Sequence, residues 1–266
     1  MKKRTVPILR SMKADSQKIA MVTAYDAAMA RMVDEAGADI ILVGDSLGNV
    51  IQGLPNTLSV TMDNMVYHTR IVSRGLEYAH LSADMPFMSY QASKDDALRN
   101  AGRLIKEAGA ESVKLETNED YLETLYAINR SGIPVMGHIG LCPQSILEMG
   151  GYKVQGRGEK EAGRLLELAK SIEQAGAFSL VLESIPQSLA KEITDAIKIP
   201  TIGIGAGPGC DGQVLVINDL LGLSPEPTPR FVKKYANLRE LVGKSTRTFI
   251  EEVKSGAFPS EEHSYD

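Results

Sequence analysis

Eight apolar runs, separated by segments with helical periodicity, constrain the fold of this chain more than any other feature. Several runs are apolar at successive positions, which is typical of parallel strands covered on both faces. Gly37, Gly109, Gly132 and Gly176 stand where an intervening helix would end and the next strand begin. The eight runs are residues 19–26, 39–45, 79–86, 112–116, 133–141, 178–184, 199–207 and 212–219.

Eight strands with helices between most of them, in a chain of 266 residues, predict an α/β fold of the (β/α)8 TIM barrel type. A doubly wound open sheet needs fewer strands, and no GxGxxG motif opens a first helix. We expect a single barrel domain over residues 1–266, with 224–266 as a C-terminal helical extension. Within that extension, residues 231–256 are expected to be a helix and 257–266 a tail.

Composition and charge exclude several classes of function. The net charge is −5, and no basic patch indicates a nucleic acid or an anionic membrane as a partner. No apolar run approaches the roughly 18 residues of a membrane span, and the apolar stretch near the start is too short for a signal peptide. Cys142 and Cys210 form neither a disulfide framework nor a CxxC motif. A reducing, cytoplasmic location is the simplest interpretation.

Acidic residues end or closely follow four of the predicted strands. Active sites of TIM barrels lie at the C-terminal ends of the strands, so Asp45, Asp84, Glu116 and Glu183 are expected on one rim. Because side chains alternate along a strand, Lys114 should point the same way as Glu116. An ordinary alternative is that each acid caps the following helix or pairs with a Lys or Arg on the rim.

Carboxylates that share a small volume need a partner. Two unit charges about 5 Å apart repel by roughly 3 kcal/mol at an effective dielectric constant near 20, so either some acids are protonated or a cation lies among them. Ligands made only of Asp and Glu favour a hard ion such as Mg²⁺ over Zn²⁺. The sequence therefore predicts a magnesium site on the rim.

Other features of the sequence leave alternatives open. A lone histidine at a strand end, such as His138, is more often structural than catalytic. The long, glycine-rich loop 142–158 is consistent with a lid or with a flexible insertion. The glycine-rich segment 203–212 fits a phosphate site or an ordinary turn, and no Lys or Arg follows it closely. Asp26 and Asp219 also end predicted strands, without an assigned task.

From ILVGDSLGNVIQGLPNTLSVTMDNMVYHTRIVSRG (41–75) onward, the sequence resembles the ketopantoate hydroxymethyltransferase family. The likeness continues in DMPFMSYQ, AGAESVKLE, IPVMGHIGLCPQS, VLESIP and IPTIGIGAGPGCDGQVLVINDLLGL, so it spans almost the whole chain. The resemblance implies transfer of a hydroxymethyl group from 5,10-methylenetetrahydrofolate to 3-methyl-2-oxobutanoate through a Mg-stabilised enolate. The product is 2-dehydropantoate, a precursor in pantothenate biosynthesis. The family also implies a homo-oligomer, a homodecamer.

The resemblance carries residue roles as well. Asp45 and Asp84 would hold the Mg²⁺ ion, with Glu116 as a further ligand, directly or through water. Glu183 would be the general base. Ser46 and Lys114 would bind the carboxylate and carbonyl region of the keto acid. The full set implied for substrate binding is Asp45, Ser46, Asp84, Lys114 and His138, the last in a supporting role.

Two alternatives to this function differ in kind. A Mg-dependent keto-acid lyase or mutase of the phosphoenolpyruvate mutase/isocitrate lyase type would use the same metal–enolate chemistry without folate. A KKCGH lid motif would favour it, and the sequence contains none. A non-catalytic barrel that serves as a binding or scaffold protein would lack the rim carboxylates, and these are present.

Overall fold

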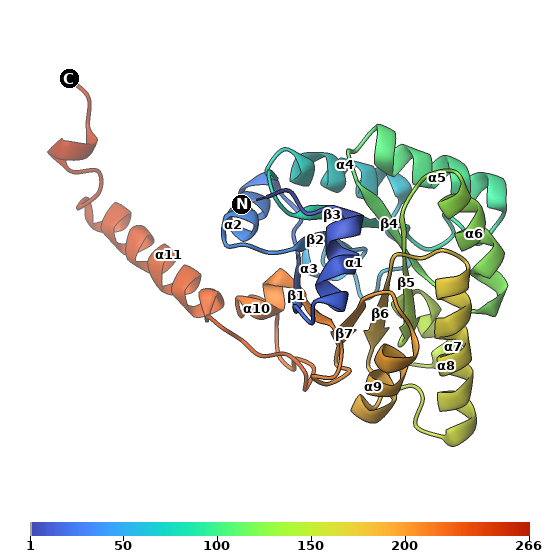
Figure 1. The fold of residues 1–266 in the computed structure, drawn as a ribbon. Coiled ribbons are helices and arrows are strands. Elements are labelled where there is room, and N and C mark those ends of the chain that lie inside the picture. Colours follow the sequence, from blue (N-terminus) through green and yellow to red (C-terminus); the bar gives the residue numbers. More distant parts are fainter. Residues whose placement is uncertain (1) are drawn as a thin grey trace. The chain divides into compact units, whose positions relative to one another are not determined.

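The computed structural model describes residues 2–266, and the chain divides into two compact units. The first unit ends at Val216 and the second is Ile217–Asp266. In the first unit, eight strands close a parallel barrel in chain order, which confirms the predicted (β/α)8 fold (Figure 1). The strands are β1 (Ile19–Thr23), β2 (Ile40–Val43), β3 (His80–Asp84), β4 (Ser112–Glu116), β5 (Val135–Gly140), β6 (Ser179–Glu183), β7 (Thr201–Ile204) and β8 (Gly212–Leu215).

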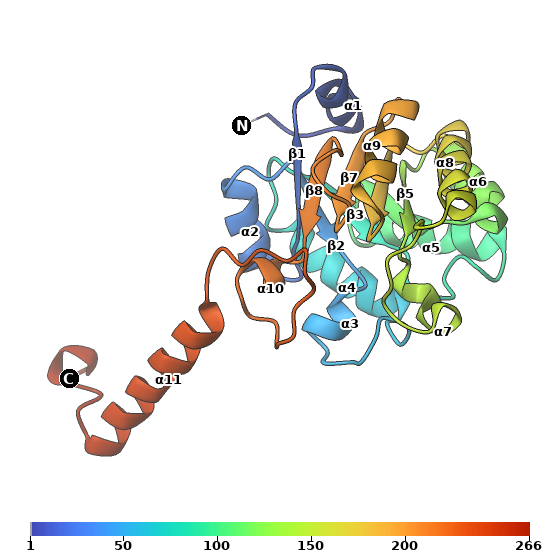
Figure 2. The ribbon, with the colours of Figure 1, turned by 90° about the horizontal axis from the view of Figure 1, so that it is seen from below.

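Helices surround the strands on the outside of the barrel (Figures 1 and 2). Their starts follow local signals in the sequence: in α5 the side chain of the N-cap residue Ser93 accepts a hydrogen bond from the Asp96 amide. The elements of the first unit are α1 (Val6–Ala14), α2 (Ala27–Glu35), α3 (Leu47–Val50), α4 (Met62–Ser73), α5 (Lys94–Lys106), η1 (Glu119–Tyr121), α6 (Leu122–Arg130), η2 (Pro143–Ser145), α7 (Ile146–Met149), α8 (Glu159–Gln174) and α9 (Gln187–Ala196).

The inside of the barrel is filled by an apolar cluster. Leu9 and Met12 of α1 pack into it together with strand side chains, so a helix that the sequence analysis did not assign helps to cover the core. Full burial of a side chain of this size contributes about 1.5–3 kcal/mol. All strands are parallel, so their carboxyl ends form one rim. The strand residues of the cluster include Ile19, Met21, Ile40, Leu42, Met136, Val181, Ile202 and Val214.

Seven of the eight strands are shorter than the apolar runs that predicted them, because the last residues of those runs already belong to the rim loops, whereas β4 matches its run of 112–116. Asp26 does not end a strand: its carboxylate accepts a hydrogen bond from the Met29 amide and caps α2. The prediction that Asp219 ends the last strand is wrong. β8 stops at Leu215, and Asp219 lies within the short helix α10 (Ile217–Leu220).

The second unit contains α10, α11 (Leu238–Ser255) and η3 (Glu261–His263). The predicted C-terminal helix therefore begins at Leu238 and not at residue 231. The amides of Tyr235 and Leu238 donate to the carbonyls of Leu220 and Leu221, so the segment before α11 pairs with the end of α10 instead of forming helical turns. None of the helices within residues 2–266 is long and apolar enough to cross a bilayer.

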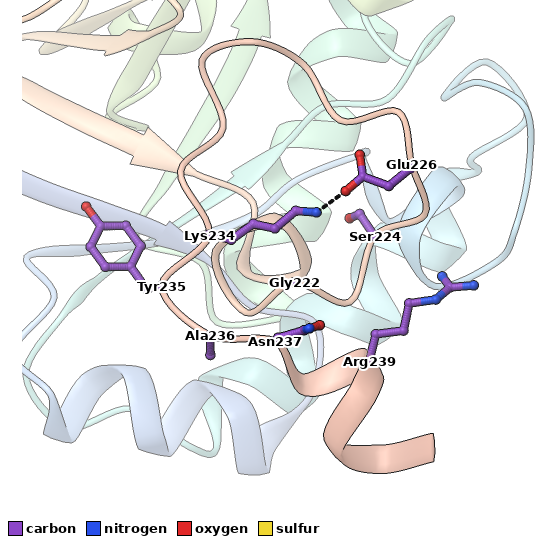
Figure 3. A pocket seen from close by; sticks show the side chains of 8 residues that line it. All are labelled: Gly222, Ser224, Glu226, Lys234, Tyr235, Ala236, Asn237 and Arg239. Atoms are coloured by element: carbon purple, nitrogen blue, oxygen red, sulfur yellow. Dashed lines mark hydrogen bonds and ion pairs between the residues drawn. The ribbon is translucent and has the colours of Figure 1, made fainter. Parts of the chain in front are cut away.

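A cavity of about 670 Å³ lies within the second unit (Figure 3). Lys234 and Glu226 form an ion pair in its wall. None of the predicted site residues lines it, so this cavity is not the site that the sequence predicts. The lining residues are Gly222, Ser224, Glu226, Lys234, Tyr235, Ala236, Asn237 and Arg239.

Candidate active site

The four predicted acids meet at the C-terminal rim of the barrel. Asp84, Glu116 and Glu183 are the last residues of β3, β4 and β6, and Asp45 follows the end of β2 by two positions. Asp45, Asp84 and Glu116 are buried, whereas the Glu183 side chain keeps 17% of its surface exposed. The structure thus places three acids in a low-dielectric environment and leaves the fourth accessible.

Asp84 is held from two sides. Its Oδ2 accepts a hydrogen bond of 3.0 Å from the backbone amide of Asp45, and its Oδ1 lies 2.8 Å from Nζ of Lys114. Asp84 and Lys114 are register partners on β3 and β4, so the barrel itself sets the pair side by side. Removing either partner of such a buried pair leaves an uncompensated charge in the interior.

Lys114 also contacts His138, and this contact fixes the protonation of the ring. Nζ of Lys114 lies 3.3 Å from Nδ1 of His138. Because an ammonium group only donates, Nδ1 is the acceptor and the ring proton is on Nε2. Burial first and the Lys114 charge second lower the pKa of His138, which keeps the imidazole neutral. Nε2 is 3.2 Å from Oε2 of Glu183, a contact that is close but poorly aligned for a hydrogen bond.

The charges of the rim do not balance. Burial tends to lower the pKa of Lys114, but Asp84, Asp45 and Glu116 outweigh it, so the pKa of this lysine lies above its usual value and the side chain is charged. Burial, with Asp84 second, raises the pKa of Asp45 to about 7. Burial, with Asp45 second, also raises the pKa of Glu116 well above its ordinary range. One lysine is insufficient to neutralise these acids together with Glu183.

Two polar residues that the sequence analysis missed belong to the same cluster. The side-chain amide of Gln144 donates a hydrogen bond of 2.8 Å to Oδ2 of Asp45, and its backbone amide donates one of 2.9 Å to Oε2 of Glu116. The hydroxyl of Tyr25 lies 2.9 Å from Oγ of the predicted substrate ligand Ser46. The only sequence signal for Gln144 is its place in the loop that follows β5, four residues after the strand ends at Gly140.

The rim fits a hard divalent ion as a two-carboxylate site. Among residues 2–266, no three His, Cys, Asp or Glu side chains are grouped so as to hold a metal ion by themselves. Mg²⁺ is typically held by one or two carboxylates, while water and substrate oxygens complete its shell. Asp45 and Asp84 supply two adjacent carboxylates, and burial first and the Asp84 charge second raise the pKa of Asp45, so a cation between the two would offset both effects.

The structure explains the glycines of the segment 203–212 and shows the path of the loop 142–158. In 203–212, a Cβ at Gly207 would lie 2.4 Å from Cβ of Gln187, and one at Gly209 would lie 3.0 Å from Cβ of Lys191, so close packing on α9 explains these glycines. The loop 142–158 forms η2 and α7 and then turns at Gly150 and Gly151, both with positive φ. That this loop acts as a lid over the site stays a prediction.

A sequence model described as ketopantoate hydroxymethyltransferase matches residues 3–261. The chain belongs to this family. The 3-methyl-2-oxobutanoate hydroxymethyltransferase of Syntrophus aciditrophicus is 55% identical over 264 residues, which cover 99% of this chain and 97% of the relative. The enzyme of the same name from Pelobacter propionicus is 56% identical over 265 residues, 100% of this chain and 98% of the relative. This confirms the resemblance that the sequence motifs indicated.

Solved structures with the same barrel include more distant proteins. A phosphonopyruvate hydrolase solved with oxalate and Mg²⁺ has a TM-score of 0.63 at 14% identity, covering 99% of this chain and 93% of that chain. A 2,3-dimethylmalate lyase, a member of the PEP mutase/isocitrate lyase superfamily, has a TM-score of 0.60 at 15% identity, with 100% and 93% covered. At such low identities the likeness shows only that this member of the ketopantoate hydroxymethyltransferase family has the same fold as these proteins.

Proposed function

We propose that this chain is a 3-methyl-2-oxobutanoate hydroxymethyltransferase. It transfers a hydroxymethyl group from 5,10-methylenetetrahydrofolate to 3-methyl-2-oxobutanoate and gives 2-dehydropantoate for pantothenate biosynthesis. The observation that carries the proposal is the buried rim cluster, in which Asp45, Asp84 and Lys114 adjoin His138 and Glu183, in a chain that belongs to the family along nearly its full length.

Asp45 and Asp84 are the residues that would hold Mg²⁺ directly, with Glu116 as a further ligand through water. When bound, the ion supplies Lewis-acid stabilisation of the negative charge that develops on the keto oxygen. The adjacency of the two aspartates, joined through the Asp45 amide at 3.0 Å, supports this assignment.

Lys114 and Ser46 would bind the carboxylate and carbonyl region of the keto acid. Lys114 stays charged although it is buried, because three acids surround it. Its ion pair with Asp84 and its contact with His138 hold the ammonium group in one place. The Tyr25 hydroxyl lies 2.9 Å from Oγ of Ser46, and this hydrogen bond orients the Ser46 hydroxyl. A substrate anion thus meets donors that need little reorganisation.

Glu183 would remove the proton from C3 of the keto acid, which leaves an enolate that attacks the one-carbon unit. It is the most exposed of the four acids and can therefore reach a bound substrate. Neutral His138 lies beside this carboxylate, with its Nε2 3.2 Å from Oε2 of Glu183, in a supporting role. A well-placed general base typically contributes 10²- to 10⁴-fold to the rate.

Family membership also supports a homodecamer in the cytoplasm as the working form. Light scattering coupled to size-exclusion chromatography tests the assembly, and a particle with about ten times the mass of one chain is the expected result. A monomer at micromolar concentration would contradict it.

The second candidate is a folate-independent keto-acid lyase or mutase, favoured only by the shared barrel of the distant structures. Incubation with Mg²⁺, 3-methyl-2-oxobutanoate and 5,10-methylenetetrahydrofolate should yield 2-dehydropantoate, detected by mass spectrometry. Parallel incubations with 2,3-dimethylmalate and with phosphonopyruvate should give no cleavage. Cleavage of either compound, without formation of 2-dehydropantoate, would replace the transferase by the lyase.

A further inference from the structure

Gln144 is buried at the rim and contacts two of the three acids assigned to the metal, Asp45 and Glu116, together with the backbone that follows the third. It lies in η2, directly after β5, on the opposite side of β4 from β2 and β3. Its side chain reaches Asp45 beyond β2 and the carbonyl of Met85, the residue after Asp84. Its backbone amide reaches Glu116 at the end of β4. One residue therefore spans four consecutive strand ends.

The hydrogen bonds of Gln144 fix the orientation of its amide. Nε2 donates to Oδ2 of Asp45 at 2.8 Å and to the Met85 carbonyl at 3.0 Å. Oε1 accepts from the Tyr90 hydroxyl at 2.9 Å and from Nε2 of Gln91 at 3.1 Å. A flipped amide would set its oxygen against the Met85 carbonyl, which only accepts. Every donor and acceptor of the buried amide is used, so the group cannot turn without breaking several bonds.

We propose that Gln144 is a positioning residue, which holds the Asp45 carboxylate in the orientation that cation and keto-acid binding require. The inference rests on the proposed function for the identity of the keto acid. The geometry separates Gln144 from the bond-making chemistry. Its hydrogen bonds go to Asp45, Glu116, the Met85 carbonyl, Tyr90 and Gln91, and none goes to Glu183. Its loss should therefore weaken binding and leave proton removal at saturation largely intact.

The test compares Gln144→Met, which keeps the length of the side chain and removes the amide, with the wild-type protein. Mn²⁺ serves as the probe ion, and its free concentration is followed by electron paramagnetic resonance. Loss of a hydrogen bond to a charged group corresponds to about 10- to 100-fold in affinity. We expect the dissociation constant for Mn²⁺ and the half-saturating concentration of 3-methyl-2-oxobutanoate to rise by that factor. The rate of C3 proton exchange at saturation should stay within about threefold.

Gln91→Leu is the matched control. It removes a hydrogen bond from the Oε1 side of the same amide and leaves the bond to Asp45 in place. Mn²⁺ and keto-acid binding should then match the wild type. Gln144→Asn, whose amide is one methylene too short to reach Asp45, repeats the test if Gln144→Met does not fold, as judged by thermal unfolding. It should weaken binding to a similar degree.

Wild-type binding by folded Gln144→Met and Gln144→Asn would overturn the proposal. Equal weakening by Gln91→Leu would also overturn it, because the effect would then belong to the network as a whole. A saturated exchange rate that falls 100-fold with unchanged binding would make Gln144 part of the chemistry and equally contradict a positioning role. If the wild-type protein binds Mn²⁺ but exchanges no proton, the proposed function fails, while the Mn²⁺ comparison still decides the role of Gln144.

Discussion

Asp45→Asn should stabilise the metal-free protein at alkaline pH, although it removes a conspicuous residue of the site. Asp45 is buried beside Asp84, and the two effects raise the pKa of its carboxyl to about 7. The unfolded chain has the ordinary value of 3.8. The folded state therefore holds a proton that the unfolded state has released between about pH 4 and 7, and stability falls as pH rises through this window.

The size of the effect follows from the shift. The pKa of Asp45 differs by about three units between the folded and the unfolded state. At 1.36 kcal/mol per unit, this corresponds to roughly 4 kcal/mol of stability that is lost once the carboxylate ionises above pH 7. Asn has no charge to desolvate, and its Oδ1 can still accept the hydrogen bond from Gln144. The variant should therefore match the wild type near pH 4 and be several kcal/mol more stable at pH 8.5.

Urea unfolding in EDTA, at pH 4.5, 6, 7 and 8.5 and at one protein concentration, measures the difference in the free energy of unfolding. Taking the difference removes the contribution of titrating groups that do not interact with Asp45, such as His80, whose pKa burial lowers to about 4. Mg²⁺ should stabilise the wild type and reverse the order of the two proteins at pH 8.5. A stability difference that is independent of pH, or that favours the wild type in EDTA at pH 8.5, would refute this reasoning.

Two other substitutions probe the rim. Lys114→Met removes the cation of a buried pair and should cost about 3–5 kcal/mol in urea unfolding, with weaker keto-acid binding, whereas Lys191→Met at an exposed pair should change little. Equal losses of stability in Lys114→Met and Lys191→Met would contradict the stronger effect expected for the buried pair. Gly140→Ala sets a Cβ 2.2 Å from the Glu183 carbonyl at a φ of 95° and should cost about 1–3 kcal/mol and slow proton exchange. The control is Gly102→Ala in α5, where no atom lies within 4 Å of the added Cβ, so this variant should be neutral or stabilising. A larger loss of stability in Gly102→Ala than in Gly140→Ala would contradict the clash.

The fold follows from periodicity because a parallel barrel requires continuous apolar strands and amphipathic helices between them. The end of β8, in contrast, cannot be predicted from periodicity. The run GQVLVIND is apolar enough for a longer strand, and only the structure, in which β8 ends at Leu215 and α10 begins at Ile217, shows that Asp219 belongs to α10. The start of α11 was misplaced for a similar reason, since the backbone bonds of Tyr235 and Leu238 to α10 are non-local.

The candidate site was predictable to the extent that strand ends define it. Asp84, Lys114, Glu116 and Glu183 occupy strand positions whose side-chain direction follows from alternation. Gln144 was not predictable in this way, because its contacts depend on the path of the loop across the rim. The protonation of His138 likewise follows from its contact with Lys114, a register detail that no local pattern reveals.

Exchange of the C3 proton of 3-methyl-2-oxobutanoate in D₂O, with Mg²⁺ and without folate, tests the central claim most directly. Proton NMR should show the wild-type protein replacing this hydrogen by deuterium, and Glu183→Gln should slow the exchange by about 10²- to 10⁴-fold while keto-acid binding stays near the wild-type value. Retention of the proton by folded, Mg²⁺-loaded wild-type protein, or an unchanged rate in Glu183→Gln, would contradict the account.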